Sequence, residues 1–153
     1  MRVLFEQFEM FEHVCDVRLR DAMTVSNIED LKIWQEARQL TKRIYVITSN
    51  SSMKHDYVLV DQMRRAAVSV MANIAEGFER CNNKEFIQYL YIAKGSCGEL
   101  RSHLFVAEDT GYISPQISNE IRTCAGGLSS MINNPIVYLK KTKIKGIKHK
   151  PIM

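Results

Sequence analysis

The four histidines are the side chains of this chain best suited to bind a metal or to act as a base near neutral pH. Di-iron bundles use Glu-x-x-His motifs, and no glutamate stands three residues before any histidine here. Glu99 and His103 are four residues apart, but one such pair supplies too few ligands for a metal. His55-Asp56 resembles the dipeptide of metal-dependent phosphohydrolases, yet it occurs once, at a predicted helix start where Asp is common. The sequence therefore predicts no metal and no cofactor.

Candidate nucleophiles also lack the partners that catalysis requires. Ser96 and Cys97 have no histidine placed by sequence to act as their base. Helical ribonucleases carry an arginine, four to six residues and then a histidine, and no histidine of this chain has an arginine at those offsets. The motifs G-x-x-x-x-G-K, G-x-G-x-x-G and G-x-S-x-G do not occur. We therefore predict that the protein is not an enzyme.

Basic charge is concentrated at the C-terminal end of the chain. The formal net charge is +4 at pH 7, yet the chain before residue 140 has 15 basic and 17 acidic residues. Residues 140–153 contain six lysines and no acid. Lysine contacts phosphate without sequence preference, so this tail is a candidate arm for RNA or DNA, and a solubilising disordered end is the other interpretation. The lysines concerned are Lys140, Lys141, Lys143, Lys145, Lys148 and Lys150.

Three further basic residues are candidates for contacting a nucleic acid. Arg64 lies in the stretch QMRRAAVSVMANIAEG, and Lys94 and Arg101 lie in KEFIQYLYIAKGSCGELR. Lys94 and Arg101 are seven residues apart and share a helix face. The alternative interpretation is that all three are ordinary solvated charges.

These residues belong to two segments that predict a helical hairpin. The segment 59–77 has apolar residues in two stripes, which indicates contacts with neighbours on more than one side. The second segment repeats apolar residues in steps of four and three from Phe86 to Ala107, which is a heptad seam. Asn82 followed by Glu85 fits a helix start near residue 83.

An antiparallel hairpin that turns near residue 80 makes facing residue numbers add to about 160. This register places Arg65 within a turn of Glu99, and Glu76 opposite Lys84. Polar groups beside an apolar seam must be paired, so we expect an Arg65–Glu99 pair, with exposure of both side chains to water as the alternative. The small residues Gly95 to Gly98 predict close approach by a neighbouring helix, either of the same chain or of another subunit.

Four amphipathic segments with short connections predict an all-α fold, an antiparallel up-and-down four-helix bundle. Ser26 and Glu29 form a capping box for the first helix, and Ser52 is the expected cap of the second. Gly111 is expected to end the third helix in a left-handed conformation. Pro135 is expected to kink or end the fourth, because proline lacks the N–H and clashes with the preceding turn.

The bundle is predicted to occupy residues 26–140. Residues 1–25 form an N-terminal extension, which is either an upstream start or an extra amphipathic helix, and residues 141–153 form a basic disordered tail. The longest nearly apolar run, residues 66–75, is shorter than the ~20 residues that span a bilayer, so no membrane partner is expected. The four cysteines contain no C-x-x-C pair, which favours reduced thiols and a cytoplasmic location.

Several motifs together carry a family resemblance over about residues 28–140. They are Asp30-Leu31 with Trp34-Gln35, Gln62 with Arg64-Arg65-Ala66, Asn73-x-Ala75-Glu76-Gly77, and Gly95-Ser96 with Glu99. This combination resembles the four-helix bundle proteins encoded in intervening sequences of bacterial 23S rRNA genes, also known as S23 ribosomal protein homologues. The accessory protein of diversity-generating retroelements looks like a relative. The chain departs from the pattern at Ser51-Ser52, where family members often have Phe-Pro.

The resemblance implies a homo-oligomer, in this family typically a pentameric ring, and no established enzymatic activity. In the retroelement relatives the ring is basic and engages nucleic acid, whereas residues 28–139 here have 12 basic and 12 acidic residues. Our leading hypothesis is a non-enzymatic oligomeric bundle that binds RNA or DNA weakly and without reading sequence, through clustered tails together with Arg64, Lys94 and Arg101. The alternative is a protein-interaction or assembly module that binds no nucleic acid.

Overall fold

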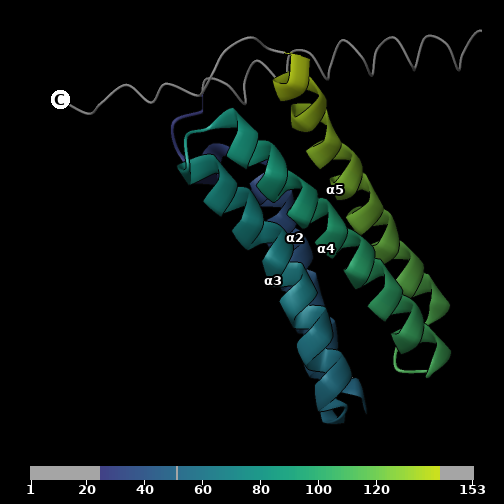
Figure 1. The fold of residues 1–153 in the computed structure, drawn as a ribbon. Coiled ribbons are helices and arrows are strands. Elements are labelled where there is room, and N and C mark those ends of the chain that lie inside the picture. Colours follow the sequence, from purple (N-terminus) through teal and green to yellow (C-terminus); the bar gives the residue numbers. More distant parts are fainter. Residues whose placement is uncertain (1–24, 51, 142–153) are drawn as a thin grey trace, which may run out of the picture.

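The computed structural model describes residues 25–50 and 52–141, and every regular element in these ranges is helical. Two short 3₁₀ turns accompany four long helices (Figure 1). α3 packs most extensively on α4 and α4 on α5, while α2 lies against α3 and closes the bundle by contacts with α5. This arrangement confirms the predicted all-α four-helix bundle. The elements are η1(Ile28–Asp30), α2(Lys32–Asn50), η2(Ser52–His55), α3(Tyr57–Glu79), α4(Asn83–Asp109) and α5(Pro115–Lys141).

Side-chain caps fix where the two central helices begin. Asp56 Oδ1 accepts a hydrogen bond from the backbone N–H of Leu59 at 3.0 Å and caps α3. Asn82 Oδ1 accepts from the N–H of Lys84 at 2.9 Å and caps α4, as predicted. Ser52 was the expected cap of the second helix, but it opens the η2 turn instead, so that prediction is wrong.

The first helix also begins later than its capping box suggests. The residues after Ser26 form the η1 turn, and its N-cap residue makes no side-chain capping bond. Leu31 is then extended, with φ −77° and ψ 115°, and its side chain is buried. α2 therefore starts at Lys32, because the extended residue lets Leu31 reach the core before the helix forms.

The end of α4 and the whole of α5 test two further predictions. Gly111 has φ +76° and ends α4, as expected, and Tyr112 N–H bonds Ala107 O at 2.9 Å. Pro135 lies inside α5, which continues to Lys141. The prediction that this proline ends the helix is wrong, because Ile136 in the following turn packs into the core.

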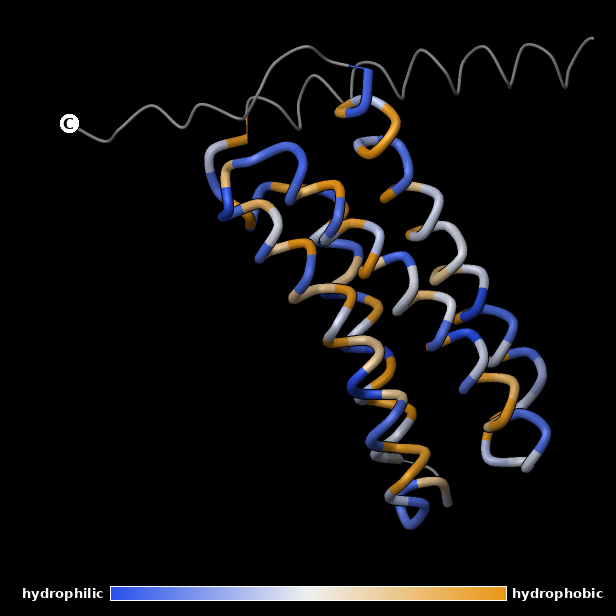
Figure 2. The backbone as a smooth tube through the Cα atoms, in the orientation of Figure 1, coloured by the Kyte–Doolittle hydropathy of each residue, from blue (hydrophilic) through white to orange (hydrophobic). Residues whose placement is uncertain are grey.

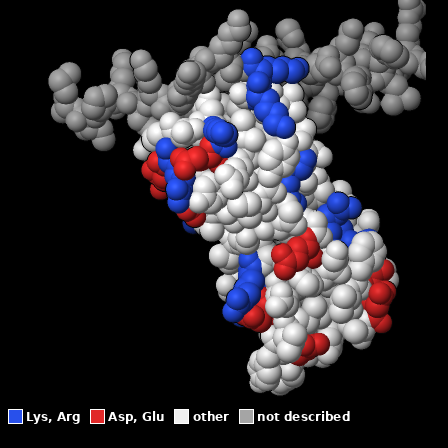
Figure 3. Space-filling view, in the orientation of Figure 1, with Lys and Arg blue, Asp and Glu red and all other residues white. Residues whose placement is uncertain are grey.

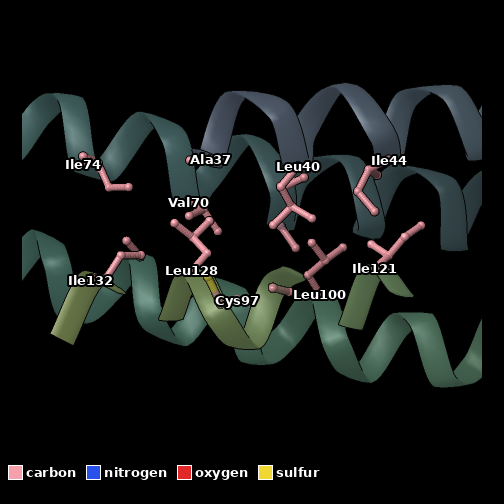
Figure 4. Close-up of a cluster of buried hydrophobic side chains, with 14 of the residues drawn as sticks. Ala37, Leu40, Ile44, Val70, Ile74, Cys97, Leu100, Ile121, Leu128 and Ile132 are labelled. Carbon is pink, nitrogen blue, oxygen red and sulfur yellow. The ribbon is translucent and has the colours of Figure 1, made fainter. Parts of the chain in front are cut away.

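A continuous apolar core lies between the four helices (Figure 4). Every helix presents a stripe of apolar residues to it and polar residues elsewhere, as the alternating colours in Figure 2 show. Within the described ranges, no helix combines the length and apolar character needed to cross a membrane. The core side chains labelled in Figure 4 are Ala37, Leu40 and Ile44 of α2, Val70 and Ile74 of α3, Cys97 and Leu100 of α4, and Ile121, Leu128 and Ile132 of α5.

Near its turn, the α3–α4 hairpin leaves no room for a side chain at Gly77. A Cβ added to Gly77 would lie 2.7 Å from Tyr89 Cβ and 2.9 Å from Phe86 Cδ2. Phe78 meets Phe86 edge to face, with 6.3 Å between ring centroids. Gly77 is therefore the position at which the two helices need a residue without a side chain, and the sequence interpretation missed it.

Candidate nucleic-acid interface

The polar residues of the hairpin do not pair as the sequence suggested. Ser69 Oγ and Ser96 Oγ lie 2.8 Å apart, and Glu76 contacts Tyr89, so facing residue numbers add to about 165 rather than 160. Arg65 Nε bonds Asp61 Oδ2 at 2.8 Å, and Glu99 Oε1 lies 3.5 Å from His103 Nε2. The Arg65–Glu99 prediction is wrong, because each residue finds a partner one turn along its own helix.

The expected proximity of Glu76 to Lys84 is replaced by a three-residue cluster. Glu76 Oε1 accepts hydrogen bonds from Arg80 Nη2 at 2.7 Å and from Tyr89 OH at 2.8 Å. The Arg80 bond first, and then the Tyr89 bond, hold the pKa of Glu76 below its usual value. The same carboxylate raises the pKa of Arg80 and of Tyr89. These contacts join α3 to α4 beside Gly77, so their role is architectural.

Arg64 lies on a different side of the bundle from the other candidate cations. Its Nε donates to Thr48 Oγ1 at 2.9 Å and its Nη2 to Ser49 Oγ at 3.0 Å. Its guanidinium carbon also lies 4.6 Å from the centroid of the Tyr45 ring. Arg64 is thus engaged between α3 and α2, and the structure does not bring it together with Lys94 and Arg101.

Lys94, Arg101 and Lys140 form a row where α4 meets α5, and we call these three residues the basic row. Lys94 Nζ donates to Asn133 Oδ1 of α5 at 2.8 Å. Lys140 reaches back from the last turn of α5 and donates to Tyr91 OH at 2.7 Å. Figure 3 shows basic side chains along this side of the bundle, from the C-terminal end of α5 downward.

No carboxylate offsets the positive charge of the basic row within the described residues. Within residues 25–50 and 52–141, neither the basic row nor Lys141 forms an ion pair, whereas Arg43, Arg65, Arg80 and Arg122 each do. Arg38, Lys42, Lys54 and Lys84 also lack one, but they are scattered over α2, η2 and the first turn of α4. The basic row leads directly into the lysine tail, whose members Lys143, Lys145, Lys148 and Lys150 lie outside the described residues.

Two exposed aromatic residues flank the basic row, and the sequence interpretation missed both. Tyr91 and Phe105 of α4 are each 46% exposed. Arg122 of α5 lies over the Phe105 ring, 3.7 Å from its centroid, and Lys140 lies 5.1 Å from that of Tyr91. The signal was the spacing Tyr91, Lys94, Gly98, Arg101 and Phe105, in steps of three and four residues.

The glycines of α4 stand in open space. A Cβ added to Gly95 or Gly98 would meet nothing within 4 Å. α3 does approach this stretch at Ser96, whose Oγ lies 2.8 Å from Ser69 Oγ, and Cys97 is buried. The two glycines themselves are not what permits this approach, because both lie on the exposed side of α4.

The described residues offer little for catalysis. They contain no group of three or more His, Cys, Asp or Glu side chains that could hold a metal ion. The Cys97 thiol is buried, and burial raises its pKa to about 11, which leaves it protonated and unreactive near neutral pH.

Comparisons with known proteins agree with this architecture. A family model described as "23S rRNA-intervening sequence protein" matches residues 29–134. Among solved structures, a protein with unknown function from the S23 ribosomal protein family of Bacteroides thetaiotaomicron superposes with a TM-score of 0.62 at 22% identity. The alignment covers 68% of this chain and 97% of that one, and at this identity it shows the fold alone. No curated protein matches the chain.

Proposed function

Because the chain belongs to the 23S rRNA-intervening sequence protein family, we propose that it is a non-enzymatic, self-associating bundle that binds RNA or DNA weakly and without reading sequence. The observation that carries this proposal is the basic row, whose cations form no ion pair among the described residues and whose member Lys140 begins the lysine-rich end of the sequence. We place this activity in the cytoplasm, where rRNA is found.

The electrostatics of the basic row favour phosphate over other ligands. A lysine or arginine that faces solvent without a carboxylate partner can neutralise a phosphate and release the cation condensed on the nucleic acid there. Each such contact makes the logarithm of the binding constant fall with the logarithm of salt concentration by about 0.9 for duplex and about 0.7 for single strands. Affinity should therefore depend strongly on salt and weakly on sequence.

Self-association would multiply this weak binding. Tyr57 and Val58 at the start of α3 are each 76% exposed, and Tyr45, Val46 and Val68 on α2 and α3 are also exposed. Exposed apolar side chains on these two helices are consistent with a contact with another protein surface. The family resemblance suggests a pentameric ring, which would bring five tails together as one multivalent arm.

The test is binding of a labelled RNA hairpin, measured by fluorescence anisotropy over a range of salt concentrations. Three proteins are compared with the full chain: one lacking residues 142–153, one carrying Lys94→Gln with Arg101→Gln, and one carrying Lys42→Gln with Lys54→Gln. The last is a matched control, because it loses the same charge from unpaired lysines outside the basic row. We expect the truncated protein and the Lys94→Gln/Arg101→Gln variant to bind more weakly, with an affinity that depends less on salt. The control variant should lose less affinity. Equal affinity for all four would contradict the proposal.

The exposed apolar residues also support the second candidate, an assembly module without nucleic-acid binding. Size-exclusion chromatography with light scattering, with and without RNA, separates the two. A stable oligomer whose mass does not change with RNA at low salt would favour the assembly module. A monomer at all concentrations would contradict self-association in both.

A further inference from the structure

The outer face of α4 carries two exposed rings, two cations and two open glycines in one line. We propose that this face is a track for single-stranded nucleic acid, in which Tyr91 and Phe105 stack on bases while Lys94 and Arg101 contact phosphates. The inference rests on the proposed nucleic-acid binding, and it adds the ligand class and the residues that recognise it. We call the surface formed by Tyr91, Lys94, Gly98, Arg101 and Phe105 the α4 track.

The spacing puts the rings on the same side of the helix. Tyr91 and Phe105 are 14 residues apart, which is four turns at 3.6 residues per turn within a small offset. At 1.5 Å per residue their Cα atoms are separated by about 21 Å along the axis, roughly six nucleotides at the 3.4 Å repeat of one strand. Both rings are 46% exposed, so an apolar surface of each is free to receive a base.

Cations from α5 hold both rings in place. Arg122 lies 3.7 Å from the Phe105 centroid and is itself fixed by Glu108, at 3.2 Å. Lys140 donates to Tyr91 OH at 2.7 Å. Each ring is therefore oriented before any ligand binds, which lowers the entropy lost when a base stacks on it.

The space between the rings suits a sugar-phosphate backbone. Gly95 and Gly98 have nothing within 4 Å of an added Cβ, so no side chain rises between Tyr91 and Phe105 at these positions. Lys94 and Arg101 lie along the edge of this open stretch, and both act electrostatically on the intervening Cys97. Glu99, the acid in this interval, is directed to His103 at 3.5 Å.

This combination favours a single strand over a duplex. Sequence-independent single-strand binding combines basic residues that follow the backbone with aromatic rings on which bases stack. A duplex offers phosphates to Lys94 and Arg101, but its base faces are covered by their neighbours. The rings would then add nothing, and an apolar surface would remain in water.

The experiment measures anisotropy of a labelled 12-nucleotide RNA, the matching DNA strand and the RNA duplex, using the full chain. The variant Tyr91→Leu with Phe105→Leu keeps apolar volume and removes both π faces, and Tyr91→Phe keeps the ring. Ile117→Ala, at an exposed apolar residue of α5 outside the α4 track and outside the surface assigned to self-association, is the control. We expect the double leucine variant to lose about tenfold or more in affinity for the single strand and none for the duplex. The control variant should bind like the wild type. Tyr91→Phe should lose only a little single-strand affinity, since it keeps the ring and loses the hydrogen bond from Lys140. Lys94→Gln with Arg101→Gln should lower the single-strand salt slope by about 1.4.

The outcomes separate this inference from the proposed function. Salt-dependent binding without single-strand preference, or an equal loss on duplex, would overturn the α4 track and leave the proposed function standing. Failure of every nucleic acid to bind would overturn both. Equal affinity for RNA and DNA strands is expected, since stacking and phosphate contacts do not sense the 2′-hydroxyl, and strict RNA dependence would overturn the track. If the double leucine variant changes the mass of the oligomer but not single-strand binding, the face is a protein interface instead.

Discussion

Glycines on the two sides of α4 differ in how closely other atoms approach them. On the side towards α3, Gly77 faces α4 so closely that an added Cβ would lie 2.7 Å from Tyr89 Cβ. On the outer side, Gly95 and Gly98 have nothing within 4 Å of an added Cβ. The same residue type therefore permits close helix packing in one place, and leaves backbone uncovered in the other.

The hydrogen bonds follow the same division. Towards α3, polar groups are satisfied within the fold, as in Ser69 with Ser96 and the cluster around Glu76. Outwards, Lys94 and Arg101 have no carboxylate partner within the described residues. The motif-rich hairpin interior thus builds the bundle, whereas the less conspicuous outer face of α4 keeps charge and aromatic surface available for a ligand.

The largest expected change in stability comes from adding a side chain at Gly77, between α3 and α4. Gly77→Ala should destabilise the protein by about 1–3 kcal/mol, because the new methyl group collides with Tyr89 and Phe86 in a packed interface. The measurement is the free energy of unfolding from urea denaturation followed by circular dichroism. An unchanged or higher stability would show that the two helices separate easily, and that Gly77 does not set their distance.

A smaller loss is expected from the polar contact across the hairpin. Ser96 is 6% exposed, and its hydroxyl lies 2.8 Å from Ser69 Oγ. Ser96→Ala should cost about 0.5–1.5 kcal/mol of unfolding free energy, the usual contribution of one intramolecular hydrogen bond. A double-mutant cycle with Ser69→Ala checks the assignment, because additive losses would mean that the two hydroxyls do not interact.

A substitution on the outer side of α4, away from α3, should change the stability in the opposite direction. Gly98→Ala should raise the unfolding free energy by up to about 1 kcal/mol, since alanine is the better helix former and the methyl group meets no neighbour. The same denaturation assay, with Gly77→Ala as the matched substitution between α3 and α4, provides the comparison. A loss of stability in dilute, monomeric protein would mean that Gly98 is covered within the chain. A loss confined to the oligomer would place a subunit contact there.

Much of the fold followed from local signals. The cap at Asn82 and the left-handed Gly111 placed the two ends of α4 correctly, because both depend on a few neighbouring residues. Pro135 did not end α5, since burial of Ile136 outweighs the local penalty of the proline. Tertiary packing, which a single sequence does not display, decided that case.

The errors at the candidate site have different causes. The shift of about five in the hairpin register brings Glu76 to Tyr89 instead of Lys84. Arg65 and Glu99 fail to pair for another reason, because both side chains point to solvent and bond Asp61 and His103 on their own helices. The close packing expected at Gly95–Gly98 was inferred from small residues alone, and that signal does not tell which glycine faces a neighbouring helix, so Gly77 was missed. Exposure of Tyr91 and Phe105 could not be read from apolar patterning, because α4 has apolar residues on both faces.

The smallest expected effect is on the pH dependence of stability, and it comes from the Glu76 cluster between α3 and α4. Arg80 first and Tyr89 second hold the pKa of Glu76 below its unfolded value of about 4.3, so this carboxylate stabilises the fold above that pH and ceases to do so as pH falls through the lower, folded pKa. Melting temperatures in low salt should therefore decline less steeply between about pH 5 and pH 2 in Glu76→Gln than in the wild type. Tyr89→Phe should fall between the two, because the Arg80 bond remains. If all three curves run parallel, water screens this exposed cluster completely, and the cluster adds nothing to the packing that holds α3 against α4.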